Sequence, residues 1–312
     1  MAKTVTMLIA LVVSLVACGP PAHVLPADPA AGGGDPPPAG GSFSLRPLGS
    51  WSSLPSGTTC AGRVHRSSWE PRPENAVANH TRVNTRAVHR SFAAAPRSIG
   101  HAYTDRWDTW LLPRVDGAFT GTTDEILQWA ACKWGLPDDL LRAIAVREST
   151  WYQALTFADG TCVPSRGCGD EVVDPAWCRY ISGSDHTYAP PCPSTFGIVG
   201  VKSISGVDAW PHHSNGTFPF NRDSTAFAAD YLGAELRGCY EGWVTWLVQV
   251  GTPYEAGDLS GCIGLWFAGD WHSPAADEYA DRVREAQRTS PWLTPAFAAA
   301  QYACDPVAGC PS

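Results

Sequence analysis

Residues 136–151, "LPDDLLRAIAVRESTW", predict a helix that carries one carboxylate on its apolar face. Pro137 suits the first helical position, and the two aspartates after it suit the positive end of the helix dipole. Apolar side chains then recur at helical spacing, and Glu148 falls on the same stripe in the last turn. Burial and the negative end of the dipole both raise the pKa of a carboxyl group. Glu148 is therefore a candidate proton donor.

Position alone leaves an alternative, because a glutamate at a helix end commonly turns outward or pairs with a neighbouring arginine. The residues around Glu148 add a second argument. A Gly-Leu-Pro turn at 135–137 leads into a helix that ends in "AIAVRES", residues 143–149. This order resembles the first motif of the soluble lytic transglycosylases, which share their fold with the goose-type lysozymes. The resemblance implies that Glu148 is the catalytic acid and base and that Ser149 lies beside the substrate.

Two later segments are similar to the same family and follow in the same order. Residues 195–200, "TFGIVG", look like its Ser-x-Gly-Leu-Met-Gln motif, with Gly200 in place of the glutamine. Residues 266–269, "WFAG", look like its Tyr-Asn-x-Gly element, with Phe267 in place of the asparagine. A late tyrosine of the family is matched by Tyr279. The residues that would line a substrate groove are Thr195, Phe196, Gly197, Gly200, Trp266, Phe267 and Tyr279. The two departures remove polar side chains, so changed specificity or lost activity stays open.

The resemblance implies a mainly α fold of the α+β, lysozyme-like kind, and a reaction on peptidoglycan. In this family one glutamate protonates the glycosidic oxygen of the β-1,4 bond between N-acetylmuramic acid and N-acetylglucosamine. The same group, now a carboxylate, takes the proton from the muramoyl O6, which closes a 1,6-anhydro ring. The implied partner is the glycan strand of peptidoglycan, with no cofactor and no metal.

Other functions stay open. Hydrolysis in the manner of lysozyme needs a second carboxylate near the groove to activate water. The candidates for that second group are Asp159, Asp170, Glu171, Asp174 and Asp270. A non-catalytic lipoprotein that binds peptidoglycan through an inherited groove is a further alternative, as is a disulfide-rich structural or adhesion protein.

The first 17 residues predict an export signal, because Lys3 precedes an apolar run that is too short to span a bilayer. The run ends in "LVAC", residues 15–18, which looks like the lipobox of bacterial lipoproteins. This resemblance implies lipidation of Cys18 and a monomer anchored to a membrane of the bacterial cell envelope. An ordinary signal with an incidental cysteine is the alternative.

The rest of the chain is expected to form a tether and one domain. Residues 18–56 are dense in Pro and Gly and predict a tether. The lysozyme-like domain is expected over 57–312, with a loop-rich wrapping arm at 57–120, a helical core at 121–290 and a tail at 291–312. A capping-box pattern predicts a helix over 122–134, and apolar stripes predict others over 224–236, 243–248 and 274–287. Strand signals are sparse.

Cysteine and charge patterns narrow the class of protein. Ten of the 11 cysteines remain if Cys18 carries lipid, and an even number outside the cytoplasm predicts five disulfides. Cys239 with Cys262 and Cys304 with Cys310 would close short loops, although spacing fixes no connectivity. No second cysteine pair has zinc-site spacing, so no metal site is expected. The net charge of −8, without a basic patch, argues against nucleic acid as a partner.

Overall fold

The computed structural model describes residues 36–37, 40–95, 106–156, 162–183, 186–204, 214–249 and 253–299. All of them belong to one compact unit, residues 31–312. The predicted signal sequence, Cys18, Asp159 and the cysteines at 304 and 310 lie outside the described residues.

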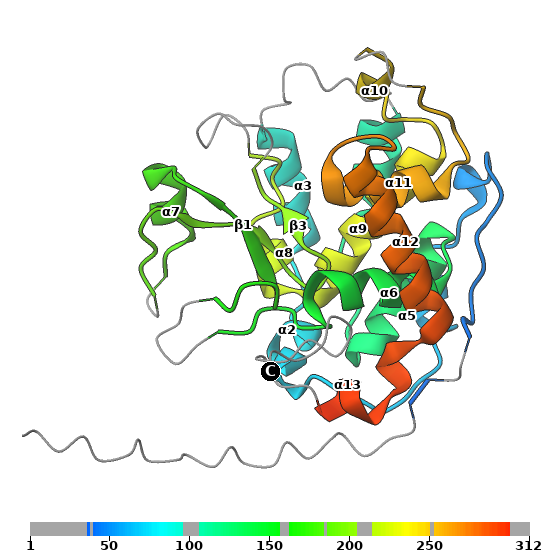
Figure 1. Cartoon of the computed structure of the whole chain (residues 1–312), viewed down its shortest axis with the longest axis horizontal. Helices are drawn as coiled ribbons and strands as arrows, with labels where there is room; N and C mark the ends of the chain where they lie inside the picture. The colour runs from blue at the N-terminus through cyan, green and yellow to red at the C-terminus, as the bar shows by residue number, and fades with distance from the viewer. Residues whose placement is uncertain are drawn as a thin grey trace, which may run out of the picture. The chain divides into compact units, whose positions relative to one another are not determined.

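Five helices form the centre of this unit (Figure 1). They are α5 (Thr123–Trp134), α6 (Asp138–Ser149), α9 (Thr225–Tyr240), α11 (Leu259–Ala268) and α12 (Pro274–Thr289). Helix α5 packs on α6 and α9, while α12 packs on α6 and α11. Their apolar stripes face one another, which buries a single large hydrophobic cluster. The mainly helical class expected from the sequence is confirmed.

The starts and ends of α5 and α6 follow from their sequence. The Thr122 hydroxyl accepts from the Glu125 amide, and the Glu125 carboxylate accepts from the Thr122 amide, so the predicted capping box is present. Such a cap contributes about 1 kcal/mol. Helix α5 then ends at Gly135, whose φ of 63° favours glycine.

A buried ion-pair network joins α5 to α6. The Nε of Arg142 lies 2.6 Å from an Asp124 oxygen, and its Nη1 lies 2.7 Å from an Asp138 oxygen. Removing one partner of such a buried network typically costs about 3–5 kcal/mol, because the remaining charges stay desolvated. The network fixes the axis of the helix that carries Glu148.

The structure also contains a small antiparallel sheet of three strands, whose positions were not predicted from the sequence. Its strands run in the order β1 (Cys168–Val172), β2 (Cys192–Phe196) and β3 (Val201–Lys202). They are too short to show the alternation that marks a strand in sequence. With α7 (Pro175–Ile181), the sheet buries a second hydrophobic cluster. Residues 197–200 connect β2 to β3 as a four-residue turn.

The segment expected to be a loop-rich arm contains short helices that pack on the core. They are α1 (Gly57–Ala61), η2 (Pro73–Asn75), α2 (Ala76–His80), α3 (Thr85–Ala94), η3 (Trp107–Leu111) and α4 (Leu112–Arg114). The disulfide between Cys60 and Cys132 fastens α1 to α5, as expected for a disulfide-stapled arm. Most of these helices have only three to five residues and are too short to show a helical pattern in the sequence. Helix α3 is longer, and its amphipathic pattern was missed in the sequence.

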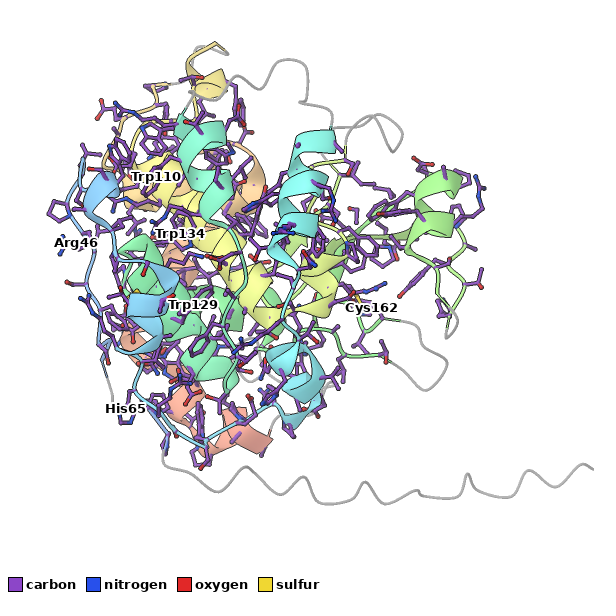
Figure 2. The ribbon with its side chains drawn as sticks, turned by 180° about the vertical axis from the view of Figure 1, so that it is seen from behind. Arg46, His65, Trp110, Trp129, Trp134 and Cys162 are labelled. Atoms are coloured by element: carbon purple, nitrogen blue, oxygen red, sulfur yellow. A yellow bond between two sulfur atoms is a disulfide. The ribbon has the colours of Figure 1, made fainter. Side chains whose placement is uncertain are left out.

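The predicted tether does not extend to residue 56, because residues 40–56 lie against the fold. The Arg46 amide donates to the Gly135 carbonyl at 2.8 Å, and the Phe43 amide donates to Asp138 at 2.9 Å. The turn η1 (Trp51–Ser53) brings Trp51 onto the core. Figure 2 labels Arg46 on the same side as Trp129 and Trp134. Composition suggested disorder, but backbone hydrogen bonds and a few large side chains order this stretch.

The remaining described elements complete the core. They are α8 (Phe220–Asp223), α10 (Trp246–Gln249), η4 (Pro291–Leu293) and α13 (Pro295–Ala299). The part of the expected tail up to Ala299 is folded, because Trp292 and Phe297 are buried against Trp151. Within the described residues, no helix is long and apolar enough to cross a membrane.

Four disulfides are formed in the described part of the chain. They are Cys60–Cys132, Cys162–Cys168, Cys178–Cys192 and Cys239–Cys262. Spacing alone fixed no pairing, and the structure joins Cys239 to Cys262, which closes a short loop and links α9 to α11. The expected fifth pair lies outside the described residues.

Candidate active site

Glu148 lies in the last turn of α6, half-buried, with its carboxylate facing α12. The hydroxyl of Tyr279, on α12, donates a hydrogen bond to its Oε1. Burial raises the pKa of Glu148 to about 7, against the lowering effects of the Tyr279 hydrogen bond and the Arg147 charge. The negative charge of Asp170 raises this pKa further. A carboxyl group poised near neutrality can both give and take a proton.

An aromatic surface adjoins this pair. The ring of Phe267, on α11, stacks on Tyr279 with centroids 4.4 Å apart and planes 2° from parallel. Phe267 is 56% exposed, so its other face is open to solvent. Flat apolar faces of this kind pack against sugar rings.

The β2–β3 turn covers the other side of the acid. A Cβ added at Gly200 would lie 2.6 Å from Glu148 Oε2, and the φ of 66° also favours glycine. The hydroxyl of Ser149 donates to the Ile198 carbonyl at 2.7 Å, and the indole nitrogen of Trp266 donates to the Val199 carbonyl at 3.2 Å. The turn is thereby held between α6 and α11. Gly200 thus stands at a position where a side chain would collide with the acid.

A buried glutamine fixes the start of the same turn. The Ile198 amide donates to Gln153 Oε1 at 2.8 Å, and Gln153 Nε2 donates to the Asn221 carbonyl at 2.6 Å. A Cβ at Gly197, where φ is 88°, would lie 2.5 Å from that carbonyl. Gly197 therefore permits the close packing that places Gly200 beside the acid.

The chain leaves α6 in an unfavourable backbone conformation. Thr150 and Trp151 have φ of 54° and 68°, in the left-handed region that costs about 1–2 kcal/mol per residue for side chains with a Cβ. Two buried residues of the arm hold this bend. Arg72 Nε donates to the Thr150 carbonyl at 2.9 Å, and Asn75 Nδ2 donates to the Trp151 carbonyl at 2.7 Å. The arm thus fixes the helix end that presents Glu148.

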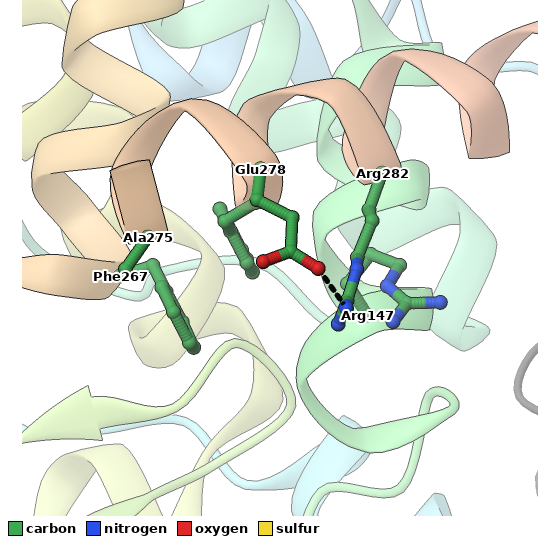
Figure 3. Close-up of a pocket in the computed structure, with 6 residues that line it drawn as sticks. Arg147, Phe267, Ala275, Glu278 and Arg282 are labelled. Carbon is green, nitrogen blue, oxygen red and sulfur yellow. Dashed lines mark hydrogen bonds and ion pairs between the residues drawn. The ribbon is translucent and has the colours of Figure 1, made fainter. Parts of the chain in front are cut away.

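A pocket opens next to the Glu148–Tyr279 pair (Figure 3). Its volume is about 220 Å³. It is lined by Arg147, Phe267, Ala275, Glu278, Tyr279 and Arg282. In Figure 3 Phe267 stands at one side of the pocket, and Arg147 and Arg282 gather at the other. The pocket combines an apolar wall with positive charge close to the proposed acid.

The predicted site residues divide into two groups. Five of them lie around the acid Glu148 or the turn that covers it: Ser149, Gly200, Trp266, Phe267 and Tyr279. Of these five, Phe267 and Tyr279 line the pocket. Ser149 is buried with its hydroxyl used on the turn, so its role there is structural. Thr195 and Phe196 are buried in the sheet, and Phe196 packs in the second hydrophobic cluster. Neither residue lines the pocket.

The candidates for a second carboxylate differ in whether they act on Glu148. Asp170, on β1, is close enough to raise the pKa of Glu148, and it pairs with Lys202 at 3.6 Å. Asp174 instead caps α7, where it accepts from the amides of Ala176 and Trp177. Glu171 and Asp270 are exposed, and no interaction links either to Glu148 within the described residues.

Several residues that shape the site were not found from the sequence. Arg147 precedes the acid, but nothing in its neighbours marks it as part of a pocket. Arg72 and Asn75 act on a bend that lies more than 70 residues later. The one available signal is that α6 ends in Ser-Thr-Trp without the glycine or asparagine that usually takes the left-handed position.

No protein-family model, curated protein or solved structure matches this chain. Among the described residues, no group of three or more His, Cys, Asp or Glu side chains is arranged to hold a metal ion.

Proposed function

We propose that this protein is a lytic transglycosylase that cleaves the β-1,4 bond between N-acetylmuramic acid and N-acetylglucosamine in peptidoglycan. The observation that carries the proposal is the state of Glu148. It is a half-buried carboxyl group with a pKa of about 7, oriented by the Tyr279 hydroxyl and bordered by a pocket with an aromatic wall. A general acid for glycoside cleavage needs this combination of a retained proton, a fixed direction and access for a sugar.

The proposed reaction uses Glu148 twice. Its carboxyl group gives a proton to the glycosidic oxygen as the bond to C1 of the muramoyl residue breaks. The resulting carboxylate then takes the proton of the muramoyl O6, whose oxygen forms the new bond to C1. Atoms balance without water, and the product ends in 1,6-anhydro-muramic acid. Gly200 leaves the second carboxylate oxygen unobstructed by a side chain.

A lysozyme-like fold is part of the same proposal. The features that support it are a helix ending in the acid, a short antiparallel sheet beside that end, and a later helix that contributes the tyrosine. Export and anchoring through Cys18 are proposed from the lipobox alone, and Cys18→Ser with membrane fractionation tests them.

The product identifies the reaction. Purified peptidoglycan should be digested with the wild-type protein, and the muropeptides should be weighed. We expect products that are lighter by one water than those of a lysozyme and that lack a reducing end. Products with a free reducing end would refute transglycosylation, and an undigested wall would favour the non-catalytic alternative.

Hydrolysis is the second candidate, and the position of Asp170 favours it. This carboxylate acts electrostatically on Glu148, and a hydrolase needs a second carboxylate to activate water. If Asp170 had that role, Asp170→Asn would lose activity by about 10²-fold or more. The transglycosylase proposal predicts only a modest change, with no change of product. The exposed neighbour Glu171, replaced by Gln, is the matched control.

A further inference from the structure

Among the residues that the structure describes, Arg147 has no ion-pair partner, and it lies next to the proposed acid in the sequence of α6. Its Nε is buried and has no hydrogen-bond partner, and the guanidinium forms no ion pair with any residue that the structure describes. A buried donor without an acceptor is costly, and a bound ligand, an ordered water or an ion can supply the missing acceptor. The next residue along α6 is Glu148.

The pocket around Arg147 carries a local excess of positive charge. Arg282 also lines it, and the only carboxylate in its wall, Glu278, is already paired with Arg282. Figure 3 shows this pair and places Arg147 next to it. The chain as a whole has a net charge of −8. Because Arg282 is paired with Glu278, Arg147 supplies the excess positive charge among the residues that line the pocket. Such a charge suits an anion, and a guanidinium binds a carboxylate through two parallel hydrogen bonds.

The opposite wall suits the ring that bears this anion. Phe267 is more than half exposed and stacks on Tyr279, which touches Glu148. A sugar ring against Phe267 would therefore lie beside the acid, with its substituents directed toward Arg147. Arg147 and Phe267 line the same pocket of about 220 Å³, so an anion attached directly to a ring on Phe267 fits between them.

We propose that Arg147, supported by Arg282, binds the lactyl carboxylate of the N-acetylmuramic acid residue at the bond to be cleaved. This inference rests on the proposed function and names its substrate class. The lactyl group is attached to the sugar ring itself, whereas the carboxylates of a stem peptide lie several bonds farther away. That carboxylate is free only where the stem peptide has been removed, since the peptide converts it to an amide. The enzyme should therefore prefer peptide-free glycan strands.

The test compares three preparations from one wall: strands with their stem peptides, strands stripped by an amidase, and stripped strands whose carboxylates have been amidated with carbodiimide and ammonia. Initial rates are measured for the wild type, Arg147→Gln and Arg147→Lys. The control is Arg284→Gln, which also removes one arginine charge. Arg284 lies on α12 near Arg282, is 56% exposed and pairs with a carboxylate, but it does not line the pocket.

We expect the wild type to cleave stripped strands about 10-fold or more faster than the other two preparations, as for loss of a charge-assisted bidentate contact. Arg147→Gln should remove this preference, because it should lower the cleavage rate of the stripped strands only. Arg147→Lys should restore the preference in part, and Arg284→Gln should leave it intact. An equal loss on all three preparations would mean that Arg147 is structural and would overturn the proposal. A preference for peptide-bearing strands would overturn it in favour of a stem-peptide site.

A second measurement separates this proposal from the proposed function. Calorimetry with Glu148→Gln and short stripped or amidated glycan chains reports binding without turnover. Tighter binding of the stripped chains, lost on adding Arg147→Gln, supports the carboxylate site even if the wild type cleaves no wall. Equal binding of both chains overturns it, even if the wild type yields anhydro products.

Discussion

The last turn of α6 and the middle of α9 each hold a glutamate with the same electrostatic character. Burial raises the pKa of Glu148 to about 7 and that of Glu235 to about 7, and each accepts a hydrogen bond from a tyrosine. Both side chains are half-buried. By pKa alone, either residue would qualify as a general acid.

The surroundings of the two residues differ. Glu148 stands at a helix end, next to a pocket, a glycine turn and a backbone bend held from outside the helix. Glu235 stands between regular turns of α9, and its partner Tyr231 does not line the pocket, whereas Arg147 and Tyr279 beside Glu148 both line it. A perturbed pKa reports desolvation, which any packed helix can produce, whereas a site also needs space for a ligand and groups that fix the acid.

The largest expected effect is on the reaction rate, which should fall when Glu148 is replaced but not when Glu235 is replaced. Glu148→Gln should lower the rate of muropeptide release by about 10²–10⁴-fold, because an amide is close in shape but cannot give up a proton. Glu235→Gln should leave the rate within about threefold of the wild type, by the same principle. Both rates are measured on purified peptidoglycan. Equal losses in the two variants would place Glu235 in the mechanism and break the comparison.

A second difference between the two regions is the bend after α6, which residues outside that helix hold in place. Asn75 donates to Trp151 and Thr123 and accepts from the Gln153 amide. Asn75→Ala should therefore lower the free energy of unfolding by about 2–4 kcal/mol and reduce the activity of the folded protein. The control is Asn79→Ala, because Asn79 is equally buried but bonds to Glu70 and Thr123. It should lose stability and keep its activity. Loss of activity in both variants would mean that the bend has no special role.

These contacts also show which features of the structure could not be predicted from the sequence. Caps and helical periodicity are local, so α5, α6 and α12 were predicted within a few residues of their bounds. Glu148 and Tyr279 were found through motif order, and the structure joins them by a hydrogen bond. The contact between Asn75 and Trp151 depends on tertiary packing across 76 residues, for which the sequence carries no local signal.

No pattern in the sequence distinguishes Glu235 from an ordinary surface residue. It follows Ala234 in the middle of a helix, where a glutamate is ordinarily a solvated residue. Its burial depends on how α9 is covered by segments distant in sequence. The short strands and the helices of the arm escaped prediction for the same reason, since tertiary packing stabilises them.

The two glutamates should have similar effects on stability. A carboxyl group whose pKa rises from 4.5 to about 7 on folding contributes stability that is fully present below pH 4.5 and is lost as pH rises through about 7. Glu235→Gln removes this loss, so it should gain about 1–3 kcal/mol relative to the wild type between pH 4 and pH 8. Denaturant unfolding with intact disulfides measures it. A difference that does not change with pH would show that Glu235 titrates normally.

The smallest expected effect comes from replacing Tyr279, whose hydroxyl group orients Glu148. For Glu148 to act as an acid it must be protonated, so kcat/KM of the wild type should fall as pH rises through about 7. The Tyr279 hydroxyl stabilises the carboxylate and lowers its pKa, so Tyr279→Phe should move this limb to higher pH. The rate below the limb should fall only about 10-fold, because the proton remains and only its direction is less fixed.

Tyr231→Phe makes the same change beside Glu235 and should leave the pH profile of activity unmoved, although it raises the pKa of that residue. A limb that stays in place in Tyr279→Phe, or that moves in Tyr231→Phe, would show that a group other than Glu148 supplies the proton.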